Sequence, residues 1–261
     1  MAGSDCSGGA GVQADLKAFS ANETFGMSVI TSVVAENTTR VLSVFNVPVE
    51  EIQKQIDAVF EDIHVDAVKL GMLPTAKIIS AVADKLNEYK PSIIVCDPVM
   101  VATSGDALSE GGTVSTMREK LFPIVTLLTP NIPEAEAISG LEIKNENHME
   151  KAARIIMDMG VKNVLVKGGH LIGDAVDYLC TPEGVHKLAC KRVDSANTHG
   201  TGCTLSSAIT ANLAHGMDML SAVTKAKNYI TEAIEKSFTV GKGHSPVNHF
   251  YDYYDLKGTV L

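Results

Sequence analysis

The chain has 261 residues, of which 45% are hydrophobic, and its 22 Lys and Arg against 31 Asp and Glu give a formal net charge of −9. This length corresponds to one large domain or two small ones with room for a buried core, and the apolar content excludes a disordered chain. The acidic balance opposes non-specific binding to DNA or RNA. We therefore expect no nucleic-acid partner, although a local basic pocket for a small phosphorylated ligand is compatible with this charge.

The chain shows no signal for a membrane or for secretion. No apolar run approaches the roughly 18–20 residues that span a bilayer, and residues 1–7 have neither a basic nor an apolar leader region. Its five cysteines are scattered and form no C-x-x-C pair, which argues against a zinc cage or a disulfide framework. We expect a reduced, cytoplasmic protein.

Short apolar runs alternate with segments of helical period along the chain. A helix is expected over 12–21 and a strand over 26–34, followed by a helix over 51–63 in which Ile52, Ile56, Val59, Phe60 and Ile63 share one face. Further strands are expected at 66–70, 92–96, 126–129 and 163–167, and further helices at 75–89, 148–159, 205–215 and 221–238. This alternation predicts one α/β domain with a largely parallel sheet, and 174–193 resembles an antiparallel meander.

The glycine-rich start of the chain has three interpretations. Residues 9–14 fit the G-x-G-x-x-A dinucleotide pattern, but the strand that this pattern requires does not precede them. A flexible glycine turn that leads into a helix is the second interpretation. The third is a backbone-lined substrate wall, with Asp15 one turn inside the helix as a hydrogen-bond acceptor.

The run NTHGTGCT at 197–204 is the most informative segment. Its glycines precede an apolar helix, so backbone N–H groups at the helix start can converge on an anion. Cys203 falls in the first helical turn, where a lowered pKa would let its thiol act as a base. The alternative is a buried structural cysteine at an ordinary helix start. The Walker A pattern of P-loop proteins is absent.

Polar residues follow three of the expected strands. Asp97 comes directly after the strand at 92–96, Asn131 and Glu134 follow the next strand, and Lys167 closes the one after. Ligands bind outside the carboxyl ends of parallel strands, so these residues should converge on one rim. A carboxylate there suits Mg²⁺, which prefers oxygen ligands.

Three basic residues beside glycines are ambiguous. His170 and His199 could catalyse, but a histidine in a tight loop more often makes a structural hydrogen bond, so neither is given a catalytic role. Lys242, between two glycines, could reach a phosphate or could simply be solvated.

These motifs together resemble the hydroxymethylpyrimidine/phosphomethylpyrimidine kinases of thiamine biosynthesis, which belong to the ribokinase-like superfamily. The matching segments occur in the expected order over nearly the whole chain. They are AGSDCSGGAGVQADLKAFSA at 2–21, KLGML at 69–73, DPVMVATSGDALS at 97–109, LTPNIPEAEAISG at 128–140, VKGGH at 166–170, NTHGTGCTLSSA at 197–208 and GKGHSPVNHF at 241–250.

The resemblance implies a ribokinase-like three-layer α/β/α sandwich with a central, mostly parallel sheet, formed by residues 1–261 as a single domain. It implies phosphoryl transfer from ATP to 4-amino-5-hydroxymethyl-2-methylpyrimidine and then to its monophosphate, by a homodimer that uses Mg²⁺.

The same resemblance assigns roles to individual residues. Cys203 would be the base in the first transfer, and the amides of Gly200, Thr201, Gly202 and Cys203 would form the anion hole. Asp97 and Glu134 would bind the metal ion. The nucleotide or its phosphates would be contacted by Lys167, Asn131 and Lys242. The pyrimidine would be contacted by Asp15, Glu36, Met72 and Val99.

Two alternatives belong to other functions. Cysteine-containing pyridoxal kinases of the same superfamily carry a second cysteine in the lid after DPVMV, whereas this lid reads ATSG at 102–105. The second alternative is a binding protein that has kept the fold and lost catalysis. The presence of Cys203, Asp97, Lys167 and the helix-start glycines argues against this alternative.

The sequence departs from the family pattern at two places. Glu36 stands where the family has a glutamine. A carboxylate can only accept hydrogen bonds, so Glu36 is expected either to bind a ring-protonated pyrimidine or to hold the proton itself. The chain also begins directly before the glycine-rich turn, so we expect that residues of an apolar first strand belong upstream of Met1.

Overall fold

A six-stranded sheet forms the centre of the computed structural model, which describes residues 1–100, 112–169, 175–190 and 192–253. Its strands lie side by side in chain order, the first four parallel and the last two antiparallel. They are β3 (Val68–Leu70), β4 (Ile94–Cys96), β5 (Leu127–Leu128), β6 (Asn163–Val166), β7 (Ala175–Thr181) and β8 (Gly184–Cys190). The four predicted strands and the predicted meander are confirmed.

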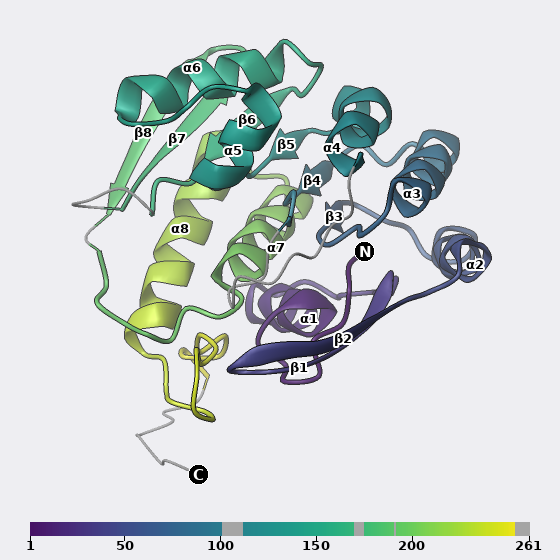
Figure 1. Cartoon of the computed structure of the whole chain (residues 1–261), viewed down its shortest axis with the longest axis horizontal. Helices are drawn as coiled ribbons and strands as arrows, with labels where there is room; N and C mark the ends of the chain where they lie inside the picture. The colour runs from purple at the N-terminus through teal and green to yellow at the C-terminus, as the bar shows by residue number, and fades with distance from the viewer. Residues whose placement is uncertain (101–111, 170–174, 191, 254–261) are drawn as a thin grey trace.

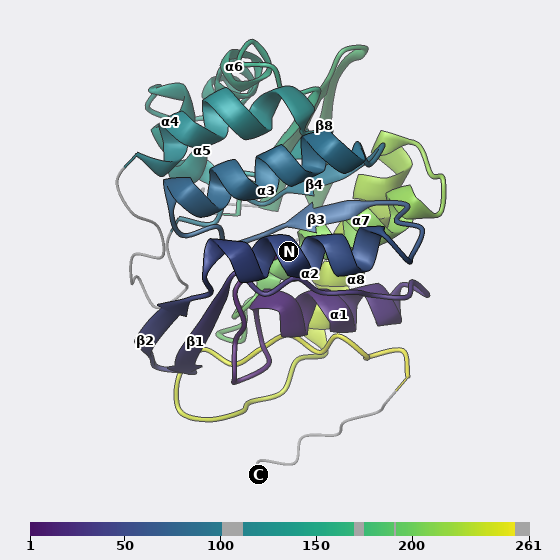
Figure 2. The same cartoon turned by 90° about the vertical axis from the view of Figure 1, so that its right-hand side faces the viewer.

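Helices cover both faces of this sheet (Figures 1 and 2). One face carries α2 (Val49–Phe60), α3 (Ala76–Tyr89), α5 (Ile132–Ser139) and α6 (Glu146–Met157), and the other carries α1 (Gly11–Ala21), α7 (Thr201–Ala214) and α8 (Met219–Glu235). Between β4 and β5 the chain forms α4 (Thr113–Thr116), a π-helical turn at Met117–Leu121 and a 3₁₀ turn at Phe122–Ile124. The predicted three-layer α/β/α architecture is confirmed.

Successive strand residues contribute to two separate cores because side chains alternate across a sheet. Cys96 and Leu128 belong to the core under α2, α3, α5 and α6, whereas Val95 and Leu127 belong to the core under α7 and α8. All four side chains are fully buried. Burial on both faces explains why these strands read as continuous apolar runs in the sequence.

A second sheet, of two antiparallel strands, was only partly anticipated. It pairs β1 (Ser32–Asn37) with β2 (Arg40–Asn46). The strand expected over 26–34 starts later, because its regular pairing partner is β2 rather than the large sheet. Most of β2 is exposed, so its sequence carries no inward-facing apolar alternation that would reveal it.

The start of the chain is hydrogen-bonded into the fold. Residues 1 and 2 lie between the segment around Ile30 and β3, with a parallel bridge from Ala2 to Ile30. None of the helices in the described ranges is long and apolar enough to cross a bilayer. The lid segment at 102–105 and His170 lie outside the described residues.

Candidate active site

A cavity of about 850 Å³ opens at the carboxyl ends of the parallel strands. Its walls come from the chain start, β1, the segments that follow β4, β5 and β6, and the first turn of α7. The predicted site residues that line it are Glu36, Met72, Asp97, Val99, Asn131, Glu134, Lys167, Gly200, Thr201, Gly202 and Cys203. The expectation that three strand ends converge on one rim is therefore confirmed.

The N-terminus of α7 points its backbone amides into this cavity. Gly200 precedes the helix with φ of 76°, and a side chain there would collide with the Gly9 carbonyl. Within the described residues, the amides of Gly202 and Cys203 have no acceptor. Unpaired amides at the positive end of a helix dipole favour an anionic ligand.

Asp97 and Lys167 form a buried ion pair beside this helix start. The Lys167 Nζ lies 2.7 Å from the Asp97 Oδ1, which also accepts a hydrogen bond from Thr129 at 3.1 Å. A Cβ placed at Gly202 would lie 3.2 Å from the Asp97 Oδ2 and 3.4 Å from the Lys167 Nζ. Although burial opposes its charge, the pKa of Lys167 is raised by Asp97 and Glu134.

Glu134 both caps a helix and faces the cavity. Its carboxylate accepts the Asn131 amide at 2.8 Å while the Asn131 side chain accepts the Glu134 amide at 2.9 Å, which makes a capping box at the start of α5. Burial raises the pKa of Glu134 to about 7; Lys167 opposes this shift and Asp97 adds to it. Two neighbouring buried carboxylates thus share one lysine, a donor set that suits a hard divalent cation.

The position of Cys203 in the first helical turn is as expected, but its predicted acidity is wrong. Burial raises the pKa of the thiol to about 11, against the opposing influence of Lys69 and of a hydrogen bond from the Gly11 backbone. Desolvation of a thiolate outweighs the helix dipole here. The thiol is therefore neutral near pH 7.

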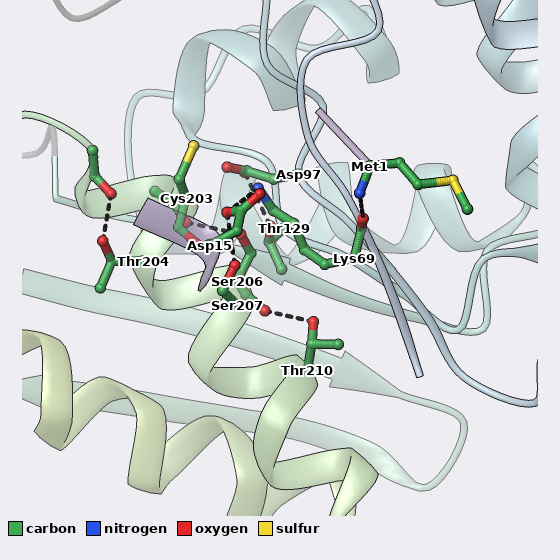
Figure 3. A network of polar contacts seen from close by, with 12 residues as sticks. Met1, Asp15, Lys69, Asp97, Thr129, Cys203, Thr204, Ser206, Ser207 and Thr210 are labelled. Carbon is green, nitrogen blue, oxygen red and sulfur yellow. Dashed lines mark hydrogen bonds and ion pairs between the residues drawn. The ribbon is translucent and has the colours of Figure 1, made fainter. Parts of the chain in front are cut away.

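Asp15 is not itself among the residues that line the cavity, and its expected contact with the pyrimidine stays a prediction. It lies on the inner side of α1, where its Oδ1 contacts the Lys69 Nζ at 2.7 Å and accepts the Ser207 hydroxyl at 2.8 Å (Figure 3). The side chains of Lys69 and Asp15 are only 1% and 5% exposed. This pair supports the cavity from beneath, close to Cys203 and Asp97.

Sequence reasoning missed Lys69, and one signal could have found it. Lys69 is a single charge inside the apolar run of a predicted strand, and such a charge requires a buried partner. Burial opposes the ammonium form, but Asp15 raises the pKa of Lys69 above its ordinary value.

Asp5 and His199 order the glycine-rich wall of the cavity. The Asp5 carboxylate accepts the amides of Ser7, Gly9 and Ala10 and lies 2.8 Å from the His199 ring nitrogen. Despite burial, these hydrogen bonds lower the pKa of Asp5 to about 2. His199 thus makes a structural hydrogen bond, as expected, and the wall around it is an ordered turn.

Glu36 enters the cavity from β1 near this wall. Burial, and next the neighbouring Asp5, raise the pKa of Glu36 to about 7. The side chain can therefore hold a proton near neutral pH.

Lys242 is not among the lining residues. It lies on an exposed loop whose amides at 242 and 243 donate to Thr38. Its expected contact with a phosphate stays a prediction.

Three comparisons relate this chain to characterised proteins. A family model described as phosphomethylpyrimidine kinase matches residues 5–248. The chain is 48% identical over 258 residues to the thiamine biosynthesis bifunctional protein ThiED of Geobacter sulfurreducens, covering 98% of this chain but only 53% of that protein. It is 43% identical to the hydroxymethylpyrimidine/phosphomethylpyrimidine kinase of Haemophilus influenzae, over 96% of this chain and 95% of the relative. An ADP complex of Bacillus subtilis pyridoxal kinase superposes with a TM-score of 0.89 at 38% identity, over 95% of each chain.

The buried Lys69–Asp15 pair beneath the cavity predicts that replacing Lys69 destabilises the protein more than replacing an exposed lysine does. Replacing Lys69 with Met leaves the Asp15 carboxylate buried without its cation, so we expect a loss of about 3–5 kcal/mol in the free energy of unfolding. Lys54→Met removes an exposed pair between Lys54 and Glu51, whose side chains are 70% and 56% exposed, and should leave the free energy of unfolding nearly unchanged. Urea denaturation measures both. Equal small losses would contradict a structural role for the Lys69 pair.

Proposed function

Because this chain belongs to the phosphomethylpyrimidine kinase family, we propose that it transfers the γ-phosphate of ATP to 4-amino-5-hydroxymethyl-2-methylpyrimidine and then to the resulting monophosphate. The observation that carries this proposal is the cavity in which a cysteine at a helix start, two acidic residues and a lysine meet. Residues 1–261 would act as a single kinase domain. None of the five cysteines, all of which lie in the described ranges, forms a disulfide, which suits a cytoplasmic location.

The two halves of the cavity suit the two kinds of ligand. Glu36, Met72 and Val99 line the side where we place the pyrimidine, while Asn131 and Lys167 line the side where we place the ATP phosphates. The transferred group would then lie over the free amides of Gly202 and Cys203. These amides and Lys167 can stabilise negative charge as it moves from donor to acceptor.

Asp97 and Glu134 would hold the Mg²⁺ ion of this reaction. Their buried carboxylates share one lysine and fit the ion's preference for oxygen donors. When bound, Mg²⁺ neutralises charge on the phosphates.

Cys203 would act only in the first transfer. The hydroxymethyl group must lose its proton as it attacks phosphorus, and the proton would pass to the Cys203 sulfur in its thiolate form. Lys69 and the Gly11 backbone, which favour the thiolate, lie close to that sulfur. The monophosphate is already largely ionised near pH 7 and needs no base.

This assignment predicts that Cys203→Ala separates the two reactions. We expect kcat for the hydroxymethyl compound to fall about 10²–10⁴-fold, while kcat for the monophosphate changes little. In the wild type, kcat for the first acceptor should rise from pH 7 to pH 9, because the thiolate fraction grows towards a pKa of about 11. Both rates are measured at saturating Mg-ATP and acceptor. Equal proportional losses for the two acceptors would show that the thiol mainly shapes the pocket.

The pyrimidine site should bind its ligand more tightly below pH 7. Glu36 is protonated below its raised pKa of about 7 and can then donate to a ring nitrogen while it accepts from the amino group. Affinity should fall as pH rises through about 7, and Glu36→Gln should flatten this dependence. Calorimetric Kd values between pH 5.5 and 8.5 test this, with the conservative Glu23→Gln variant as control. An unchanged pH profile in Glu36→Gln would exclude direct contact.

We also propose that two copies of the chain associate through the β1–β2 sheet. Val33 and Phe45 are directly paired across the strands, so they share one face, and they are 52% and 66% exposed. Such an apolar patch favours burial against a second copy.

A dimer through this face predicts a change in sedimentation for Phe45→Lys. The added charge should convert the dimer to a monomer, whereas Phe25→Lys, at a site that is 83% exposed, should leave it intact. Analytical ultracentrifugation measures both. A dimer that persists in Phe45→Lys would place the interface elsewhere.

A further inference from the structure

Lys167 lies where the chain leaves β6, between two neighbouring strands. Its amide donates to the Pro130 carbonyl at 2.9 Å, and a parallel bridge joins it to Asn131, so its backbone is held on the β5 side. On the other side, the register of β6 with β7 ends at the pair of Val166 and Tyr178. Beyond that pair, the position of the chain relative to β7 depends on other contacts.

A side chain of β7 supplies the next contact. The Asp177 Oδ1 accepts the Gly168 amide at 2.9 Å, in a buried hydrogen bond. The two segments approach closely here, because a Cβ at position 168 would collide with the Val176 carbonyl. The residue that follows Lys167 is therefore held against β7 by a carboxylate, and only glycine fits in its place.

Asp177 is itself held by a buried ion pair. Lys227 comes from α8, and its Nζ contacts the Asp177 Oδ2, so the two carboxylate oxygens have different partners. Both side chains are only 9% exposed. A lone charge is costly at such burial, so Lys227 stabilises the carboxylate as well as orienting it. Both residues line the active-site cavity.

We propose that Asp177 is a positioning residue for Lys167, and that Lys227 orients the carboxylate that holds the turn. This rests on the proposed function, in which Lys167 stabilises negative charge on the transferred phosphoryl group. The lysine side chain is long, so its ammonium reaches that group reproducibly only if its backbone is fixed on both sides. A displacement of about 1 Å can cost on the order of 10²-fold in rate. Both transfers use Lys167, so a displaced turn slows both, unlike loss of the Cys203 thiol.

Two double variants that differ only at position 177 test this role. Asp177→Asn/Lys227→Met keeps an oxygen that can accept the Gly168 amide, whereas Asp177→Leu/Lys227→Met has a side chain of similar size without an acceptor. Removing both charges together leaves no unpaired buried ion, and any separate contribution of Lys227 cancels in the comparison. We expect kcat at saturating Mg-ATP to be about 10–10²-fold lower in the leucine variant than in the asparagine variant, by the same factor for both acceptors.

Hydrogen exchange measures the turn itself, without reference to activity. The amides of Lys167 and Gly168 should exchange faster in the leucine variant than in the asparagine variant, because the turn has lost its acceptor. The amide of Leu165, inside β6, should exchange equally in both. Equal kcat in the two variants, a loss confined to one acceptor, or equal exchange at Gly168 would overturn the proposal.

Two further arrangements keep these outcomes distinct. If the leucine variant does not fold, Asp177→Ala/Lys227→Met supplies the same comparison, because a water molecule can occupy the space that the carboxylate leaves. Failure of the wild type to phosphorylate either acceptor would refute the proposed function. Transfer by the wild type with equal kcat in the two variants would refute the positioning role alone.

Discussion

The close approach of α7 to the ends of β4 and β6 is the constraint on which the site depends. Gly202 lies against both Asp97 and Lys167, and Gly200 lies against the Gly9 backbone. A side chain at position 200 would collide with the Gly9 carbonyl and push the helix away, and one at position 202 would crowd Asp97 and Lys167. The glycine-rich wall, the helix N-terminus and the ion pair thus form one cavity because positions 200 and 202 of this helix start carry no Cβ atom.

The charges around this contact balance one another closely. Asp97 and Glu134 face Lys167, and beneath them Asp15 faces Lys69. Burial penalises each charge singly, but the pairs hold both lysines ionised. The Cys203 thiol sits within this balanced set and remains neutral, so an added negative charge on sulfur must be supported by Lys69. A phosphate and a divalent cation would enter as a further balanced pair.

Much of this arrangement could be predicted from the sequence, and the exceptions have physical causes. The spacing of Ile52 and Ile56 predicted α2, and continuous apolar runs predicted β4 and β6, because burial imposes those patterns. The exposed strand β2 carries no such pattern. The helix α5 was not among the expected helices, although Asn131 and Glu134 form the capping-box signature. The pairing of Asp15 with Lys69 was not anticipated, because that contact joins residues 54 positions apart.

The capping box at α5 couples a backbone amide to the charge state of the cavity. The Glu134 carboxylate accepts the Asn131 amide proton and also borders the space between Asp97 and Lys167. Whatever protonates this carboxylate or draws it towards a cation weakens its bond to that amide. The amide resonance of Asn131 should therefore shift whenever the cavity fills, and so serve as a spectroscopic reporter of the charge state of Glu134.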